Sequence, residues 1–326
     1  MTNLIYCNAS RLLLLFALTA SFSNVKAEEN EAFDIFSLSL EELLKVKISV
    51  SSSFEESPLD ASSSVSKLNR SDWQRIGARN VLDAIANQPT VSVLATIFGG
   101  NGLAVRGYGG VNSVRGHAFI LDGVTMNDFV TGTALYGHRK LQLGILDNIE
   151  MIRGPGSALY GTSAFHSVVS MNSFESQIDV GEASLGQSSD DYTEANFRLS
   201  HGLTSNVRLS SALAFSRQGE QDREYSYTNP DTLTLEKSAR DNQFNAFSGV
   251  MKLDYELDEL HLDFDVYHLR NNSNKFSGVG RVVRGVSITK EKDWSESNGE
   301  LSMVKSGLSW QLDSQQNIES TAYYRK

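Results

Sequence analysis

Residues 207–216 read Val-Arg-Leu-Ser-Ser-Ala-Leu-Ala-Phe-Ser, and large apolar side chains recur at every second position in much of the stretch. Successive side chains of an extended strand point to opposite faces. One face therefore carries Leu209, Leu213 and Phe215. The other face carries Arg208 together with serine and alanine residues. This alternation predicts a β-strand of about ten residues with one apolar and one polar face.

The same alternation recurs further along the chain, in residues 251–257 and 260–267. Asp258-Glu259 is a short turn between these two stretches, whereas Gly219–Asp241 and Asn271–Ser295 are long and polar. Strands of this length, with short turns at one end and long loops at the other, are typical of a transmembrane β-barrel. We therefore expect about seven antiparallel barrel strands after Ile178.

The barrel hypothesis assigns a face to each side chain. The apolar residues expected to face lipid are Leu209, Leu213, Phe215, Leu262 and Phe264. The residues expected to face the lumen are Arg208, Asp254 and Asp263. A soluble β-sandwich also alternates and is the alternative at this point. Long strands and charges on the polar faces favour the barrel.

The region from about Val65 to Asn172 has the composition of a compact α+β domain. Ser71, with Gln74 three residues later, predicts the start of a short helix that Gly77 ends. Asn80 predicts the cap of a second helix, over residues 81–87. Short strands should follow, at Val91–Ala95, Leu103–Arg106, Ala118–Leu121, Ile149–Ile152 and Val168–Met171.

Four segments, in this order, resemble the TonB-dependent outer-membrane receptors. They are the extended stretch Ile48–Ser52, the apolar-Arg-Gly segment Ala104–Gly107, the apolar-Asp-Gly-Val segment Phe119–Val124 and the run Ile149–Gly161. The resemblance assigns to the TonB box the residues Ile48, Ser49, Val50, Ser51 and Ser52. It assigns to the motifs of the plug domain the residues Arg106, Gly107, Asp122, Gly123, Glu150, Arg153, Gly154, Pro155, Tyr160 and Gly161.

The resemblance implies a gated importer rather than an enzyme. Its partners would be the periplasmic protein TonB, bound through Ile48–Ser52, outer-membrane lipid, and a small chelate of the ferric siderophore or cobalamin type. An extended TonB box can add a strand to the edge of a partner's sheet through main-chain hydrogen bonds. In the family, arginines placed like Arg106 and Arg153 meet glutamates of the inner barrel wall. No resident cofactor or metal is expected.

The N-terminus reads as a secretory signal. Arg11 precedes the apolar run Leu12–Ala20, and Val25-Lys26-Ala27 places small residues for cleavage after Ala27. Removal leaves 27 basic against 39 acidic groups, a net charge of −12, which disfavours nucleic acid as a partner. It also removes Cys7, the only cysteine. Localisation in the outer membrane of a Gram-negative bacterium follows from the resemblance.

The expected organisation is a signal peptide at 1–27, a mobile segment with the TonB box at 28–64, a plug at 65–176 and the first barrel strands at 177–326. Plugged outer-membrane transporters have about 22 strands, so we expect this chain to be a fragment. No nucleotide-binding, metalloprotease or nucleophile-elbow motif occurs. The alternative function is a receptor remnant that binds or adheres without transport.

Overall fold

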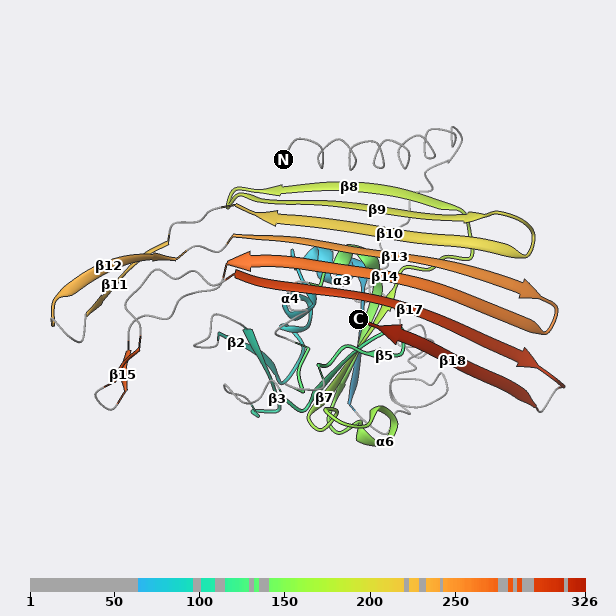
Figure 1. Ribbon diagram of the computed structural model, residues 1–326, viewed down its shortest axis with the longest axis horizontal. Helices are drawn as coiled ribbons and strands as arrows, with labels where there is room; N and C mark the ends of the chain where they lie inside the picture. Colours follow the sequence, from blue (N-terminus) through green and yellow to red (C-terminus); the bar gives the residue numbers. More distant parts are fainter. Residues whose placement is uncertain are drawn as a thin grey trace, which may run out of the picture.

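The computed structural model describes residues 64–95, 101–108, 115–128, 132–134, 141–219, 223–228, 233–240, 243–274, 281–283, 286–288, 296–313 and 316–326. The expected signal peptide and the TonB box Ile48–Ser52 lie outside these residues. The structure comprises a mixed α+β domain that lies against one face of a seven-stranded sheet, here termed the wall (Figure 1).

A five-stranded sheet with the order β1-β6-β7-β4-β5 forms the centre of the mixed domain. Its strands are β1 Val65–Asn69, β4 His117–Leu121, β5 Val124–Thr125, β6 Leu146–Arg153 and β7 Ser167–Ser173. Strands β4 and β7 run parallel, and the other neighbours are antiparallel. The sheet is accompanied by a hairpin, β2 Val91–Ala95 with β3 Asn101–Val105, and by η2 Leu143–Ile145 and α6 Ser157–Tyr160.

Two short helices follow β1, and the residues that cap their N-termini differ from the prediction in one helix. Helix α3 spans Arg70–Arg75, and Asp72 accepts a hydrogen bond of 2.8 Å from the Asn69 N–H. The predicted capping pair Ser71 and Gln74 is therefore wrong, because the chain already turns into the helix at Asn69. Helix α4 spans Val81–Ile85 and ends earlier than predicted, but Asn80 caps it as expected, accepting from Leu82 N–H at 3.0 Å.

The wall is antiparallel throughout and has the order β18-β17-β14-β13-β10-β9-β8. Its strands are β8 Val180–Ser188, β9 Tyr192–Gly202, β10 Val207–Gln218, β13 Phe244–Leu257, β14 Leu260–Asn274, β17 Glu296–Gln311 and β18 Asn317–Arg325. The strand number agrees with the sequence prediction. Both expected long loops contain hairpins, so they are not wholly irregular: β11 Arg223–Thr228 with β12 Leu235–Arg240, and β15 Arg281–Val283 with β16 Val286–Ile288.

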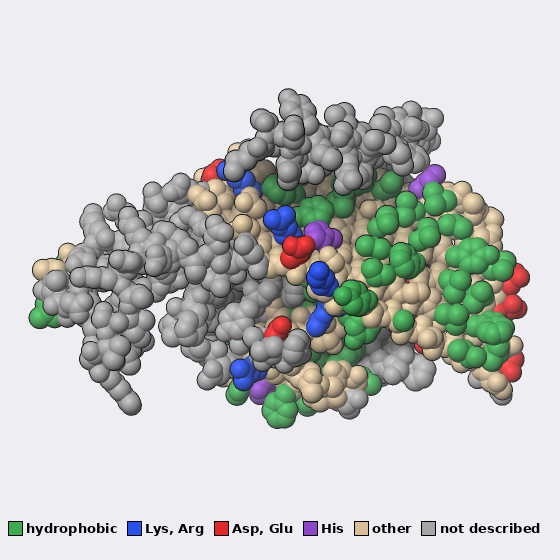
Figure 2. All heavy atoms as spheres, in the orientation of Figure 1, with side chains coloured by type: hydrophobic (Ala, Val, Ile, Leu, Met, Phe, Trp, Pro, Cys, Tyr) green, Lys and Arg blue, Asp and Glu red, His purple; other side chains and the backbone are tan. Residues whose placement is uncertain are grey.

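The two faces of the wall differ as predicted. On the outer face, Phe215 is 43% and Phe264 46% exposed, so no second sheet of the described residues covers them. Hydrophobic side chains gather over this face towards the end with the short turns (Figure 2). On the inner face, Asp254 is only 7% exposed. No helix among the described residues is long and apolar enough to cross a membrane.

Candidate functional site

The predicted motif residue Glu150 fastens the edge strand of the mixed sheet. It lies on β6 directly opposite Lys67 on β1, and its Oε1 is 2.9 Å from the Lys67 Nζ. Glu150 is 2% exposed, and a buried carboxylate needs such a partner. Burial, with the charge of Glu150 second, raises the pKa of the nearby motif residue Tyr160. Glu150 thus has a structural partner within the domain.

Arg153 and Arg106 come together at the end of β6. The Arg153 guanidinium donates to the carbonyl oxygens of Pro89 at 3.3 Å and Val65 at 3.4 Å. Burial lowers the pKa of Arg153, and the charge of Arg106 lowers it further. A Cβ added at Gly154 would lie 3.4 Å from the Arg106 Nη1. Within the described residues, Arg153 therefore bonds plug carbonyl groups rather than a glutamate of the wall.

The other motif residues occupy turns. Pro155 is exposed at the turn before α6. The motif glycines have φ values in the left-handed half of the map, namely Gly107 at 79°, Gly123 at 83°, Gly154 at 153° and Gly161 at 67°. These φ values, which residues with a side chain rarely adopt, explain why glycine occupies these four turn positions.

Asp122 is the predicted motif residue that reaches the wall. It forms the two-residue loop between β4 and β5 with Gly123, and its φ of 45° is left-handed, which a short Asp side chain tolerates. Its carboxylate accepts hydrogen bonds from the Ser173 N–H at 2.8 Å and from the Tyr267 O–H at 2.7 Å. The Lys252 Nζ lies 3.6 Å away. A single side chain therefore ties the hairpin to β7 and to the wall.

Arg198 makes a polar contact of three hydrogen bonds between wall and mixed domain, which was not predicted from the sequence. From β9 it donates to Gly144 O at 2.9 Å, to Asp147 Oδ1 at 2.8 Å and to Leu146 O. Its side chain is 4% exposed. Burial raises the pKa of Asp147, and the charge of Arg198 acts against that rise.

The backbone of η2 lies unusually close to the wall beside this arginine. A Cβ added at Gly144 would overlap the Asn196 side chain and would lie 2.8 Å from the Ala214 Cβ. Only glycine therefore fits at this position without displacement of the wall. The sequence feature that could have predicted this contact is an arginine at an inward-facing position of a strand, because a charge placed there needs a partner.

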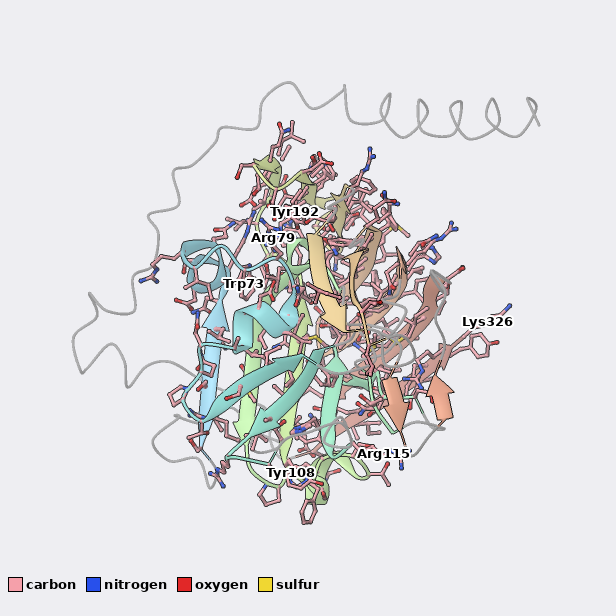
Figure 3. The ribbon with its side chains drawn as sticks, turned by 90° about the vertical axis from the view of Figure 1, so that its left-hand side faces the viewer. Trp73, Arg79, Tyr108, Arg115, Tyr192 and Lys326 are labelled. Atoms are coloured by element: carbon pink, nitrogen blue, oxygen red, sulfur yellow. The ribbon has the colours of Figure 1, made fainter. Side chains whose placement is uncertain are left out.

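Two further arginines link the first helices to the wall. Arg70, at the start of α3, forms an ion pair with Glu182 on β8. Arg79 donates to Asp190 in the β8–β9 turn at 2.7 and 3.0 Å and lies 4.3 Å from the centroid of the Tyr192 ring. Figure 3 shows Arg79 and Tyr192 side by side, with Tyr108 and Arg115 at the opposite end of the molecule. Hydrogen bonds from Arg79 hold the pKa of Asp190 well below its usual range.

Comparison with known proteins identifies this arrangement. Residues 57–168 match the family model of the TonB-dependent receptor plug domain. The chain carries a TonB-dependent receptor plug. A vitamin B12 transporter, BtuB, of Vibrio vulnificus strain CMCP6 is 26% identical over 209 residues, which cover 60% of this chain and 33% of that protein. The chain thus spans about a third of the length of the curated relatives it matches.

Solved receptors share the fold of both parts. The outer-membrane ferripyoverdine receptor of Pseudomonas aeruginosa superposes with a TM-score of 0.62 at 16% identity, covering 81% of this chain and 34% of that one. The siderophore receptor PiuA of Acinetobacter baumannii gives a TM-score of 0.64 at 17% identity, covering 88% and 39%. The predicted fold, a plug followed by the first strands of a barrel, is confirmed. The family consists of outer-membrane receptors and not of enzymes, as predicted.

Proposed function

We propose that this chain is the N-terminal part of a TonB-dependent transporter that imports a scarce metal chelate across the outer membrane. The observation that carries the proposal is a plug held by buried polar contacts on the polar face of a wall whose other face is apolar. A polar, plugged interior behind a lipid-facing surface is what a gated pore requires. The relatives bind or transport vitamin B12 and ferric siderophores, which supports cobalamin or a ferric siderophore as substrate class.

The proposed division of the chain keeps the boundaries predicted from its sequence. A signal peptide, residues 1–27, is removed after Ala27 on export, and residues 28–64 carry the TonB box. The plug occupies residues 65–176 and the barrel strands residues 177–326. Strand β1 is an edge strand that pairs only with β6 in the described sheet, and it begins at Val65, 13 positions after Ser52 at the end of the TonB box.

In this proposal TonB pairs with Ile48–Ser52 by strand addition and pulls on the plug through β1. The Lys67–Glu150 pair and the Arg153 bond to Val65 O are then the first contacts under load. Arg106, Gly107, Asp122, Gly123, Gly154, Pro155, Tyr160 and Gly161 keep the plug in shape.

Uptake measurements test the proposal. The receptor is produced from its native gene in a strain deprived of its own chelate receptors, and radiolabelled cobalamin and ferric siderophores are offered with and without TonB. We expect TonB-dependent uptake of one class, abolished by Val50→Pro at unchanged abundance because proline removes a main-chain donor. Val50→Thr, which preserves the extended strand, is the control. Chelate binding without uptake in the TonB-positive strain would contradict the proposal and support the binding remnant.

A further inference from the structure

One row of residues crosses the inner face of the whole wall. Each member is the register partner of the next, from β8 at one edge of the sheet to β18 at the other. The row consists of Glu182, Arg198, Ala212, Val250, Tyr267, Met303 and Arg325.

Every polar member of this row binds the plug. Glu182 forms an ion pair with Arg70, and Arg198 binds Asp147. Tyr267 donates its hydroxyl to Asp122. Arg325 donates to Thr125 O and, at 3.2 Å, to Asn127 O. Three plug segments that are distant in sequence, around Arg70, residues 122–127 and Asp147, thus meet one line across the wall.

The other members of the row are apolar and buried. Ala212, Val250 and Met303 are 0%, 2% and 1% exposed. The adjoining rows are mixed. Asn196 donates to Ser184 on the wall and Lys305 pairs with Asp265 on the wall. Lys252 reaches Glu175 and Asp122 of the plug, Ser248 accepts from the Gln142 N–H, and Ser200 donates to Ser176 O.

We infer that this row, the docking belt, is the surface by which the wall selects and orients its plug. Its polarity changes along its length: an anion at Glu182, a cation at Arg198 and hydrogen-bond donors at Tyr267 and Arg325. Neighbouring strands lie about 4.8 Å apart. A plug displaced by one strand would set Arg70 against Arg198, a like-charge contact, and Asp147 against Ala212, which offers no partner. Unpaired and like charges of this kind exclude alternative registers.

The docking belt is tested by swapping the charges of paired residues in the full chain. The measurement does not depend on transport. The reporter is a disulfide between Gln142→Cys and Ser248→Cys in a Cys7→Ser background. The Gln142 N–H lies 3.4 Å from the Ser248 Oγ, so the pair reports the seating of η2 on the wall. We expect Arg198→Asp or Asp147→Arg alone to lower the disulfide yield about tenfold, because each sets two like charges against each other across the contact. The exchange of both should restore it to within about twofold.

A matched control and a second pair keep the test decisive. Arg208→Asp also reverses an inward-facing arginine, but Arg208 bonds Asp179 and Ser200 rather than plug residues of the described β4–β7 region, so the yield should not change. Arg70→Glu and Glu182→Arg each alter a partly exposed ion pair, so a change in disulfide yield would not result from unfolding of the protein. Each should lower the yield about threefold, and their combination should restore it. Unchanged yields in all single variants, or failure of both exchanges to restore, would overturn the belt.

Discussion

Two arginines bind aspartates across the contact between plug and wall with nearly the same geometry. Arg198 lies 2.8 Å from Asp147 in the middle of the contact, and Arg79 lies 2.7 Å from Asp190 at the rim. Their side chains differ in exposure, at 4% for Arg198 and 35% for Arg79. Water and salt reach both partners of the rim pair but only the aspartate of the central pair. Equal distances therefore do not mean equal contributions, and burial decides which pair holds the plug.

Loss of the central arginine should have the largest effect. Arg198→Ala removes the donor of the Asp147 Oδ1 and of two carbonyl groups. We expect a loss of about 3 kcal/mol in the stability of the plug on the wall, at the low end for broken buried pairs because Asp147 remains 32% exposed. Hydrogen–deuterium exchange of the β6 and η2 amides measures this loss. Exchange as slow as in the unaltered protein would show that Arg198 is dispensable.

A substitution that crowds the contact between η2 and the wall should have the second-largest effect. Gly144→Ala places a methyl group against Asn196 and Ala214, so wall and η2 must separate slightly. Overpacking of this kind costs about 2 kcal/mol. Ser205→Ala, in the exposed β9–β10 turn, is the control and should have no effect. Hydrogen–deuterium exchange of the β6 and η2 amides again measures the effect. If the η2 amides exchange as slowly as in the control, the close approach of η2 to the wall is refuted.

Removal of the rim arginine should have a smaller effect that depends on salt. Arg79→Ala removes two hydrogen bonds to Asp190 and the contact with the Tyr192 ring. We expect faster proteolysis of the α3–α4 connection at low ionic strength and little difference from the unaltered protein in about 1 M salt, where the screening length is about 3 Å. A difference independent of salt would mean that the rim pair is not governed by screened charge.

Acid should remove the contribution of the rim pair. The pKa of Asp190 is depressed in the folded protein, so the stabilisation is complete above the unfolded value of about 4 and is lost as the pH falls from there through the folded value. The proteolytic difference between the unaltered protein and Arg79→Ala, measured with an acid-stable protease, should therefore shrink below about pH 4. An equal or larger difference in acid would contradict this direction.

The sequence predicted the wall better than the contact. Alternation identified the faces of Phe215, Phe264 and Asp254, because strand parity is a local property. It could not name the partners of Arg198, because Asp147 and Gly144 come from a different fold unit about 50 residues away, and only the docked structure brings them together. Asp122 was recognised as a motif residue, but its bond to Tyr267, 145 residues on, has no local signal.

The central claim is that the pair of buried Arg198 with Asp147, in the middle of the contact, holds the plug on the wall. A double-mutant cycle of Arg198→Ala and Asp147→Ala, read by hydrogen–deuterium exchange of the η2 amides, tests it most directly. We predict a coupling of about 1.5 kcal/mol or more, so that the second substitution adds little once the first is present. Additive losses, with a coupling near zero, would contradict the account.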